Sequence, residues 1–126
     1  DEPDNYRKIL TNRASEPYLK AMATALQRVS EYKAYAKSFA DKARATQARA
    51  ESFAPHATSM EAQGDMMGAT TARHEIQQLL QQSKALQGDA EKYWKIAQDA
   101  QTSVKQWQDA SYAAAAYMTQ EYDLGR

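Results

Sequence analysis

The sequence predicts an all-α fold: an antiparallel bundle of three long helices, about 16–53, 59–87 and 90–123, with a short N-terminal helix, about 4–13, as a possible fourth. Alanine, the best helix former, is abundant along the chain. Alternating apolar runs rich in Val, Ile and Thr, which mark strands, are missing. Apolar residues instead recur at steps of three and four, the period of a helix with one buried face. Because no low-complexity linker is present, residues 1–126 are predicted to form a single helical-bundle domain.

The first long helix is the longest predicted element. Ser15 is a suitable N-cap, and Pro17 is tolerated in the first turn of a helix. Its main apolar row steps by three and four through Leu19, Met22, Leu26, Val29, Lys33, Ala36, Ala40, Ala43, Gln47 and Ala50. A second row, seven residues apart, consists of Tyr18, Ala25, Tyr32, Phe39, Thr46 and Phe53. The two rows together predict an apolar face three positions wide in every heptad.

The middle helix has two candidate starts. Thr58 and Glu61 fit a capping box, which places the start near residue 59. Gly64 and Gly68 would each cost about 1 kcal/mol in a helix interior, which favours a later start near residue 70. The sequence leaves both starts open.

The last long helix begins after Gly88, where a glycine in the left-handed conformation would end the middle helix. Asp89 is then its N-cap. Its main apolar row consists of Ala90, Tyr93, Ala97, Ala100, Val104, Trp107, Ser111, Ala114 and Met118. The seven-residue period predicts gentle left-handed packing, as in antiparallel bundles and coiled coils.

Charge is balanced overall but uneven along the chain. With 16 basic and 16 acidic residues the net charge is zero, whereas nucleic-acid binding usually shows a basic excess, so nucleic acid is not an expected partner. Residues 7–49 nevertheless carry ten basic and three acidic groups. This favours pairing of a basic helix with acidic neighbours inside the bundle. The alternative is a basic face for an anionic partner, including peripheral contact with a membrane surface.

Patterns that would carry catalysis are missing. The chain has no cysteine, which excludes disulfides, thiolate nucleophiles and cysteine-built zinc sites. His74 and Glu75 lack a second histidine four residues on, so the zinc-protease helix pattern is absent. Gly-rich phosphate loops, nucleophile elbows and Glu-x-x-His pairs are also missing. The sequence therefore predicts a protein that is not an enzyme and has no cofactor.

One stretch, residues 56–75, carries side chains that suit copper(I): the imidazoles of His56 and His74 and the thioethers of Met60 and Met67. If the middle helix starts at residue 58, Met60, Met67 and His74 lie seven residues apart in one row. That row is roughly 21 Å long, too long for one ion to contact all three. The favoured interpretation is flexible filler residues and a surface histidine, with a copper site as the alternative.

The segment ASYAAAAYM, residues 110–118, is the strongest interaction signal because it is apolar nearly all round its helix. Tyr112, Tyr117 and Met118 are candidate anchors for a protein partner, and Tyr35 lies off its own helix's main row and could join the same surface. The alternative is that the N-terminal helix covers this segment through Tyr6, Ile9 and Leu10. The predicted function is a non-enzymatic interaction or assembly subunit that binds a protein partner, as an extrinsic or accessory subunit of a larger complex.

The stretch TTARHEIQQLLQQSKALQ, residues 70–87, resembles the Gln/Leu-rich helical segment of minor pilus-tip proteins from type IV secretion systems. That resemblance implies a pilus-associated helical component as another alternative. In size and architecture the chain is also similar to helical-bundle extrinsic proteins of the thylakoid lumen. The first residues, DEPDNY, contain no methionine, which suits an exported or lumenal mature protein after removal of a targeting segment, although a trimmed chain would look the same.

Overall fold

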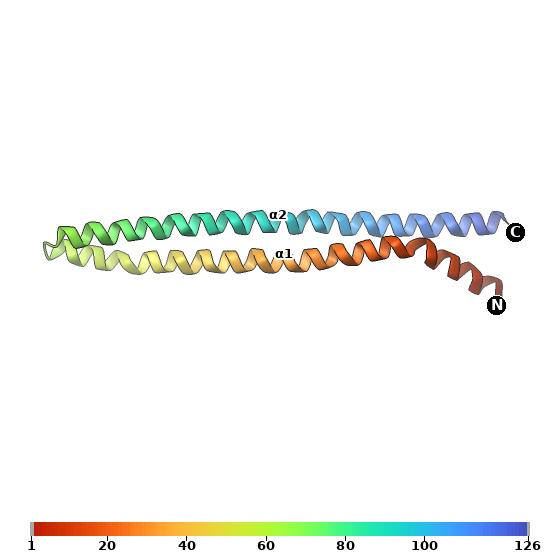
Figure 1. Ribbon diagram of the computed structural model, residues 1–126, viewed down its shortest axis with the longest axis horizontal. Coiled ribbons are helices and arrows are strands. Elements are labelled where there is room, and N and C mark those ends of the chain that lie inside the picture. The colour runs from red at the N-terminus through yellow and green to blue at the C-terminus, as the bar shows by residue number, and fades with distance from the viewer. Residues whose placement is uncertain (1, 126) are drawn as a thin grey trace. The chain divides into compact units, whose positions relative to one another are not determined.

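The computed structural model describes residues 2–125, with side chains from Asp4 on. Two helices, α1 (Glu2–Ala62) and α2 (Met66–Leu124), pack against each other as a helical hairpin (Figure 1). The all-α prediction is confirmed, but the predicted bundle of three long helices and a short one is wrong. The expected short N-terminal helix is part of α1, and the expected middle and last helices are both parts of α2.

The predicted helix 16–53 is wrong at both ends, because α1 continues through Pro17 and Pro55. Both prolines are exposed, so each missing N–H removes a hydrogen bond on the solvent side of the helix. Figure 1 shows a bend near the N-terminal end of α1, in its red part. A proline together with Ser15, whose hydroxyl donates to the carbonyl oxygen of Thr11 at 3.2 Å, is a known cause of such bends.

The predicted helices 59–87 and 90–123 are wrong because Gly88 does not end a helix. Gly88 lies inside α2, and Gly64 is the only glycine with positive φ among the described residues. The apolar row keeps its seven-residue phase across Gly88, from buried Ser83 through Ala90 to buried Ala97. Continuous packing against α1 therefore holds the helix together where local propensity alone favours a break.

The chain reverses at residues 63–65. Gly64 has φ of +82°, in the left-handed region that favours glycine, and the Asp65 N–H donates to the Met60 carbonyl at 2.8 Å. The Asp65 carboxylate then caps α2 by accepting from the Gly68 N–H at 2.9 Å. Thr58 belongs to α1 rather than to a capping box, and both predicted starts, near residues 59 and 70, are wrong.

A narrow seam of small side chains joins the helices. Nine of the eleven buried apolar residues are alanine, and no large side chain is fully buried among the described residues. The buried positions on α1 are Ser15, Ala25, Val29, Ala36, Ala43, Ala50 and Ala57. Those on α2 are Ala69, Ala72, Leu79, Ser83, Ala97, Ala100 and Ser111. They recur at steps of three, four or seven, or at sums of these steps, as expected for helices that pair along a heptad seam.

The predicted apolar face is wider than the seam that forms. Leu19 and Leu26 were expected in the main row of the first helix, yet they are 45% and 47% exposed. Lys33 and Gln47, from the same predicted row, are exposed as well. A face three positions wide needs more than one neighbouring helix to cover it, and the hairpin supplies one.

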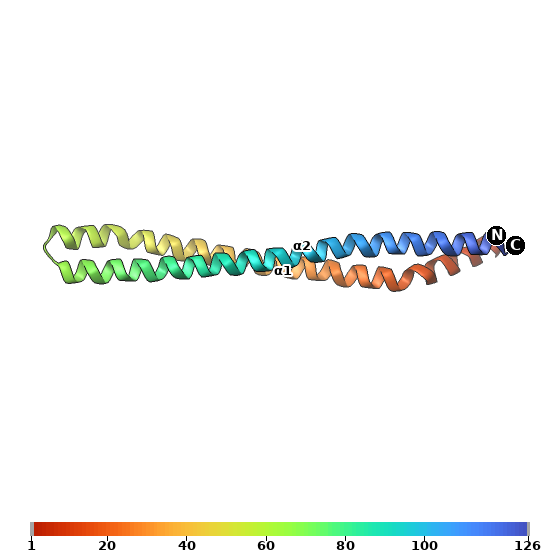
Figure 2. The ribbon, with the colours of Figure 1, turned by 90° about the horizontal axis from the view of Figure 1, so that it is seen from above.

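The hairpin divides into two compact units, each built from a stretch of both helices. Of the described residues, unit 1 contains 2–32 and 96–125, and unit 2 contains Lys33–Lys95. In unit 2 both views show the two helices side by side around the turn (Figures 1 and 2). An ion pair between Arg73 and Glu61 spans the helices near that turn.

Unit 1 pairs the beginning of the chain with its end. The Arg7 guanidinium lies 3.1 Å from the Asp123 carboxylate, and the hydroxyls of Thr11 and Thr119 lie 3.3 Å apart. Tyr18 packs against Trp107, with ring centroids 6.2 Å apart. These contacts link residues 7–18 of α1 to residues 107–123 of α2.

Candidate interaction surfaces

The tyrosines predicted to anchor a partner are exposed. Tyr112 and Tyr117 in unit 1 are 66% and 61% exposed, whereas Met118 is half-buried. The Tyr112 hydroxyl accepts a hydrogen bond from the Gln108 amide at 3.4 Å. Residues five apart on a helix are separated by about 140°, so the two tyrosines lie on opposite sides of the seam. The structure therefore does not bring them together on one surface.

Tyr35, the fourth predicted anchor, belongs to unit 2. Its side chain is 50% exposed, and its ring packs against Tyr93 with centroids 5.7 Å apart. Tyr93 also stacks on Phe39, at 5.3 Å and 10° between the ring planes. Tyr35 therefore lies at the edge of an aromatic cluster that bridges the two helices of unit 2.

The four predicted copper ligands are not arranged in one row. Met60 and His56 lie on α1, whereas Met67 and His74 lie on α2, so the turn at residues 63–65 interrupts the expected row. Met67 is 85% exposed, and His74 contacts the Gln78 amide at 3.2 Å. Among the described residues, no three His, Asp or Glu side chains are close enough to hold a metal ion. The copper hypothesis stays a prediction from the sequence.

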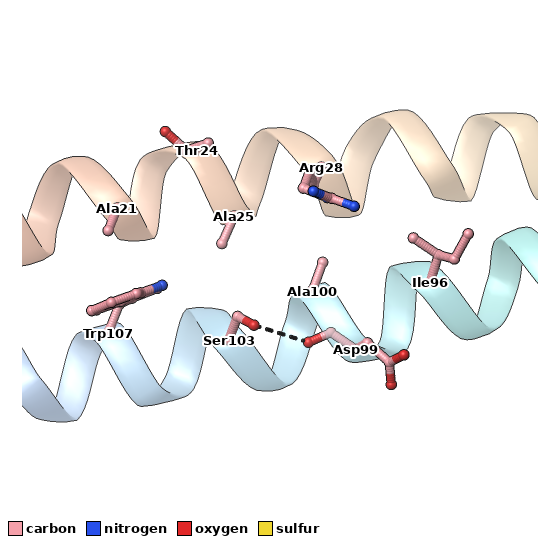
Figure 3. Close-up of a pocket in the computed structure, with 9 residues that line it drawn as sticks. All are labelled: Ala21, Thr24, Ala25, Arg28, Ile96, Asp99, Ala100, Ser103 and Trp107. Atoms are coloured by element: carbon pink, nitrogen blue, oxygen red, sulfur yellow. Dashed lines mark hydrogen bonds between the residues drawn. The ribbon is translucent and has the colours of Figure 1, made fainter.

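An open hollow of about 520 Å³ lies between the helices of unit 1 (Figure 3). Its lining comprises Ala21, Thr24, Ala25 and Arg28 from α1, and Ile96, Asp99, Ala100, Ser103 and Trp107 from α2. Figure 3 shows the alanine methyl groups directed into the space between the helices, with Trp107 at one end and Ile96 at the other. The small floor residues leave room that no side chain of the described chain fills.

The hollow continues into a longer surface along α2. Ser103 lines the hollow and donates to the Asp99 carbonyl oxygen at 3.3 Å. Ala110, Tyr117 and Leu124 follow at steps of seven, so they share its side of the helix. We call the hollow together with Ala110, Tyr117 and Leu124 the unit 1 flank. It is apolar along its centre, with Arg28 and Asp99 at its polar edge.

No family model, curated protein or solved structure matches this chain. None of the described helices combines the length and apolarity needed to cross a membrane. No buried side-chain nitrogen or oxygen among the described residues lacks a hydrogen-bond partner.

Sequence reasoning assigned Trp107 to the core and gave no role to Trp94. The structure leaves both half-exposed, at 40% and 47%. Trp107 lies seven residues after Ala100 and borders the seam. Trp94, four residues after Ala90, lies next to the seam rather than in it. The phase of a two-helix seam would have identified Trp94 as an outer residue, because only two positions in each heptad are then covered.

Proposed function

We propose that the protein is a non-enzymatic assembly subunit, an extrinsic or accessory component of a larger complex that binds a helix of a protein partner along the unit 1 flank. The observation that carries the proposal is the open hollow, with its alanine floor and half-exposed Trp107. Grooves of this kind accept the apolar face of an amphipathic helix, which anchors through side chains three and four residues apart.

The chemistry of the flank indicates what such a partner presents. A large aliphatic or aromatic side chain fits over the methyl groups of Ala21, Ala25 and Ala100, where burial of apolar surface stabilises a complex. Arg28 and Asp99 at the edge suit a polar rim with both signs of charge. Tyr117 adds an exposed aromatic ring of the type enriched in protein interfaces.

The partner is identified by placing a photo-reactive phenylalanine analogue at Ser103 and irradiating the protein in a native extract. Mass spectrometry identifies the cross-linked protein, and calorimetry with the purified partner measures its affinity. Tyr117→Asp is expected to weaken binding at least tenfold, because a carboxylate would be desolvated in the interface. Ser103→Phe, which fills the hollow, is expected to do the same.

Tyr112→Asp is the matched control, since it makes the same change on the opposite side of α2. It is expected to retain binding, and circular dichroism is expected to show unchanged helicity for all three variants. Loss of binding in Tyr112→Asp with retention in Tyr117→Asp would place the interface on the side of α2 opposite the unit 1 flank, and would contradict the proposal. Full binding by both Tyr117→Asp and Ser103→Phe would refute the proposal.

A further inference from the structure

Unit 2 has a second open surface, distinct in its residues from the unit 1 flank. A hollow of about 310 Å³ is lined by Lys33, Ala36, Lys37, Ala40, Ala90, Glu91 and Trp94. Trp94 is 47% exposed, and the Lys33 ammonium lies 5.9 Å from the centroid of its ring. We call these seven residues the unit 2 flank.

The antiparallel helices place complementary groups opposite each other across this flank. At one end Lys33 of α1 faces Trp94 of α2. One turn further along, Lys37 and Glu91 line the two sides of the hollow. Neither forms an ion pair within the described chain, so both charges are available to a partner.

We propose that the unit 2 flank binds the same flank of a second copy of this chain. In a two-fold dimer whose axis runs parallel to the helices, α1 of each copy lies over α2 of the other. Each residue on the α1 side of the flank faces an α2 residue within its own chain. In the dimer it also meets that same α2 residue of the other copy. All four helices of the two paired units have antiparallel neighbours, the arrangement of an up-down four-helix bundle.

This arrangement makes the flank complementary to itself. Lys37 of one copy meets Glu91 of the other, and the symmetry produces that contact twice. Lys33 meets the other copy's Trp94, a cation over an aromatic ring. Alanines 36, 40 and 90 form a floor with no side chain beyond Cβ, so the indole rings find space there.

The next charged pair along the flank is compatible with this dimer. Arg44, seven residues after Lys37, would approach Lys84 of the other copy. The charge of Arg44 is offset within its own helix, because the Arg44 guanidinium lies 2.5 Å from the Asp41 carboxylate. The opposed Lys37 and Glu91 therefore set the preferred orientation, and like-charge repulsion at Arg44 is reduced.

The test is sedimentation velocity of the full chain over a range of concentrations, with two charge-reversal variants. Wild type is expected to dimerise. Lys37→Glu and Glu91→Lys, each alone, are expected to weaken the dimer about tenfold or more, since each converts two attractive contacts into two repulsive ones. An equimolar mixture of the two variants is expected to restore a dimer that contains one copy of each, detected by native mass spectrometry.

Restoration on mixing distinguishes contact between copies from contact within one chain. In the mixture each chain still carries like charges at positions 37 and 91, and only the contacts between the two different variants join opposite charges. Lys42→Glu, on the same helix but the opposite side of the seam, is the matched control and is expected to dimerise as wild type does. A wild type that stays monomeric, a mixture that fails to restore the dimer, or equal weakening by Lys42→Glu would each overturn the proposal. Partner binding at the unit 1 flank is measured separately, so the two proposals can fail independently.

Discussion

The Ser83 hydroxyl donates a hydrogen bond to the backbone carbonyl oxygen of Ala43, on the facing helix, at 2.8 Å. Ser83 is 3% exposed and Ala43 1% exposed. A serine side chain is short, so it reaches a carbonyl across the seam only where the two backbones approach closely. The alanines at neighbouring seam positions permit that approach, and distances between helix axes depend on side-chain size.

Enlarging the seam at this point is expected to destabilise the hairpin. Ala43→Leu should lower the free energy of unfolding by about 1–3 kcal/mol, because added methylenes force packed helices apart. Ala48→Leu, the same change at an exposed position of α1, should leave it within about 0.5 kcal/mol. Urea unfolding followed by circular dichroism measures both. Equal stability of the two variants would mean that the helices are not closely packed at Ala43.

Two leucines distinguish the two-helix seam from the three-helix bundle that the sequence predicts. Leu79 is 5% exposed, so Leu79→Ala should cost about 2 kcal/mol or more of unfolding free energy. Leu26 is 47% exposed, so Leu26→Ala should change it by no more than about 0.5 kcal/mol. In a three-helix bundle both leucines would be in the core. A comparable loss at Leu26 in dilute protein would therefore contradict the hairpin.

Two glycines should respond to alanine in opposite directions. Gly64 has φ of +82°, where an alanine side chain is strained, so Gly64→Ala should destabilise the protein by about 1 kcal/mol. Gly88 lies inside α2 with open space where a Cβ would be added, so Gly88→Ala should stabilise it by about 0.5–1 kcal/mol. Thermal unfolding of the two variants checks the signs. If Gly64→Ala is more stable than the wild type, the turn does not require a positive φ at residue 64, which would contradict the observed turn.

The helical class and most seam residues could be predicted from the sequence, because the heptad spacing is regular. Met22, Val29, Ala36, Ala43 and Ala50 were expected in the core and lie in the seam, buried or half-buried. The helix ends could not be predicted from Pro55 and Gly88, since these report only local preference. The informative signal was phase: the seven-residue row runs unbroken across Gly88 and stops before the turn at Gly64.

The width of the apolar face could not be converted into a number of helices. Leu19 and Leu26 beside the seam are equally consistent with a third helix in the same chain and with a separate chain. For the same reason the sequence placed Trp107 in the core without revealing the hollow beside it. Tyr112 and Tyr117 are exposed, and their role as anchors for a partner stays a prediction. Their separation onto opposite flanks follows only when the seam between them is located.

The division of the hairpin into two units sets the order in which it can form during synthesis. Unit 2 closes around a turn, and its Arg73–Glu61 ion pair joins residues only 12 apart. Unit 1 joins the two ends of the chain, and its Arg7–Asp123 pair spans 116 residues. The α1 part of unit 1 therefore leaves the ribosome long before the α2 residues that cover its seam, and it acquires that cover only after the residues from Ile96 on have been synthesised. Pairing of unit 2 shortens the loop that remains to be closed, which lowers the entropic cost of completing unit 1.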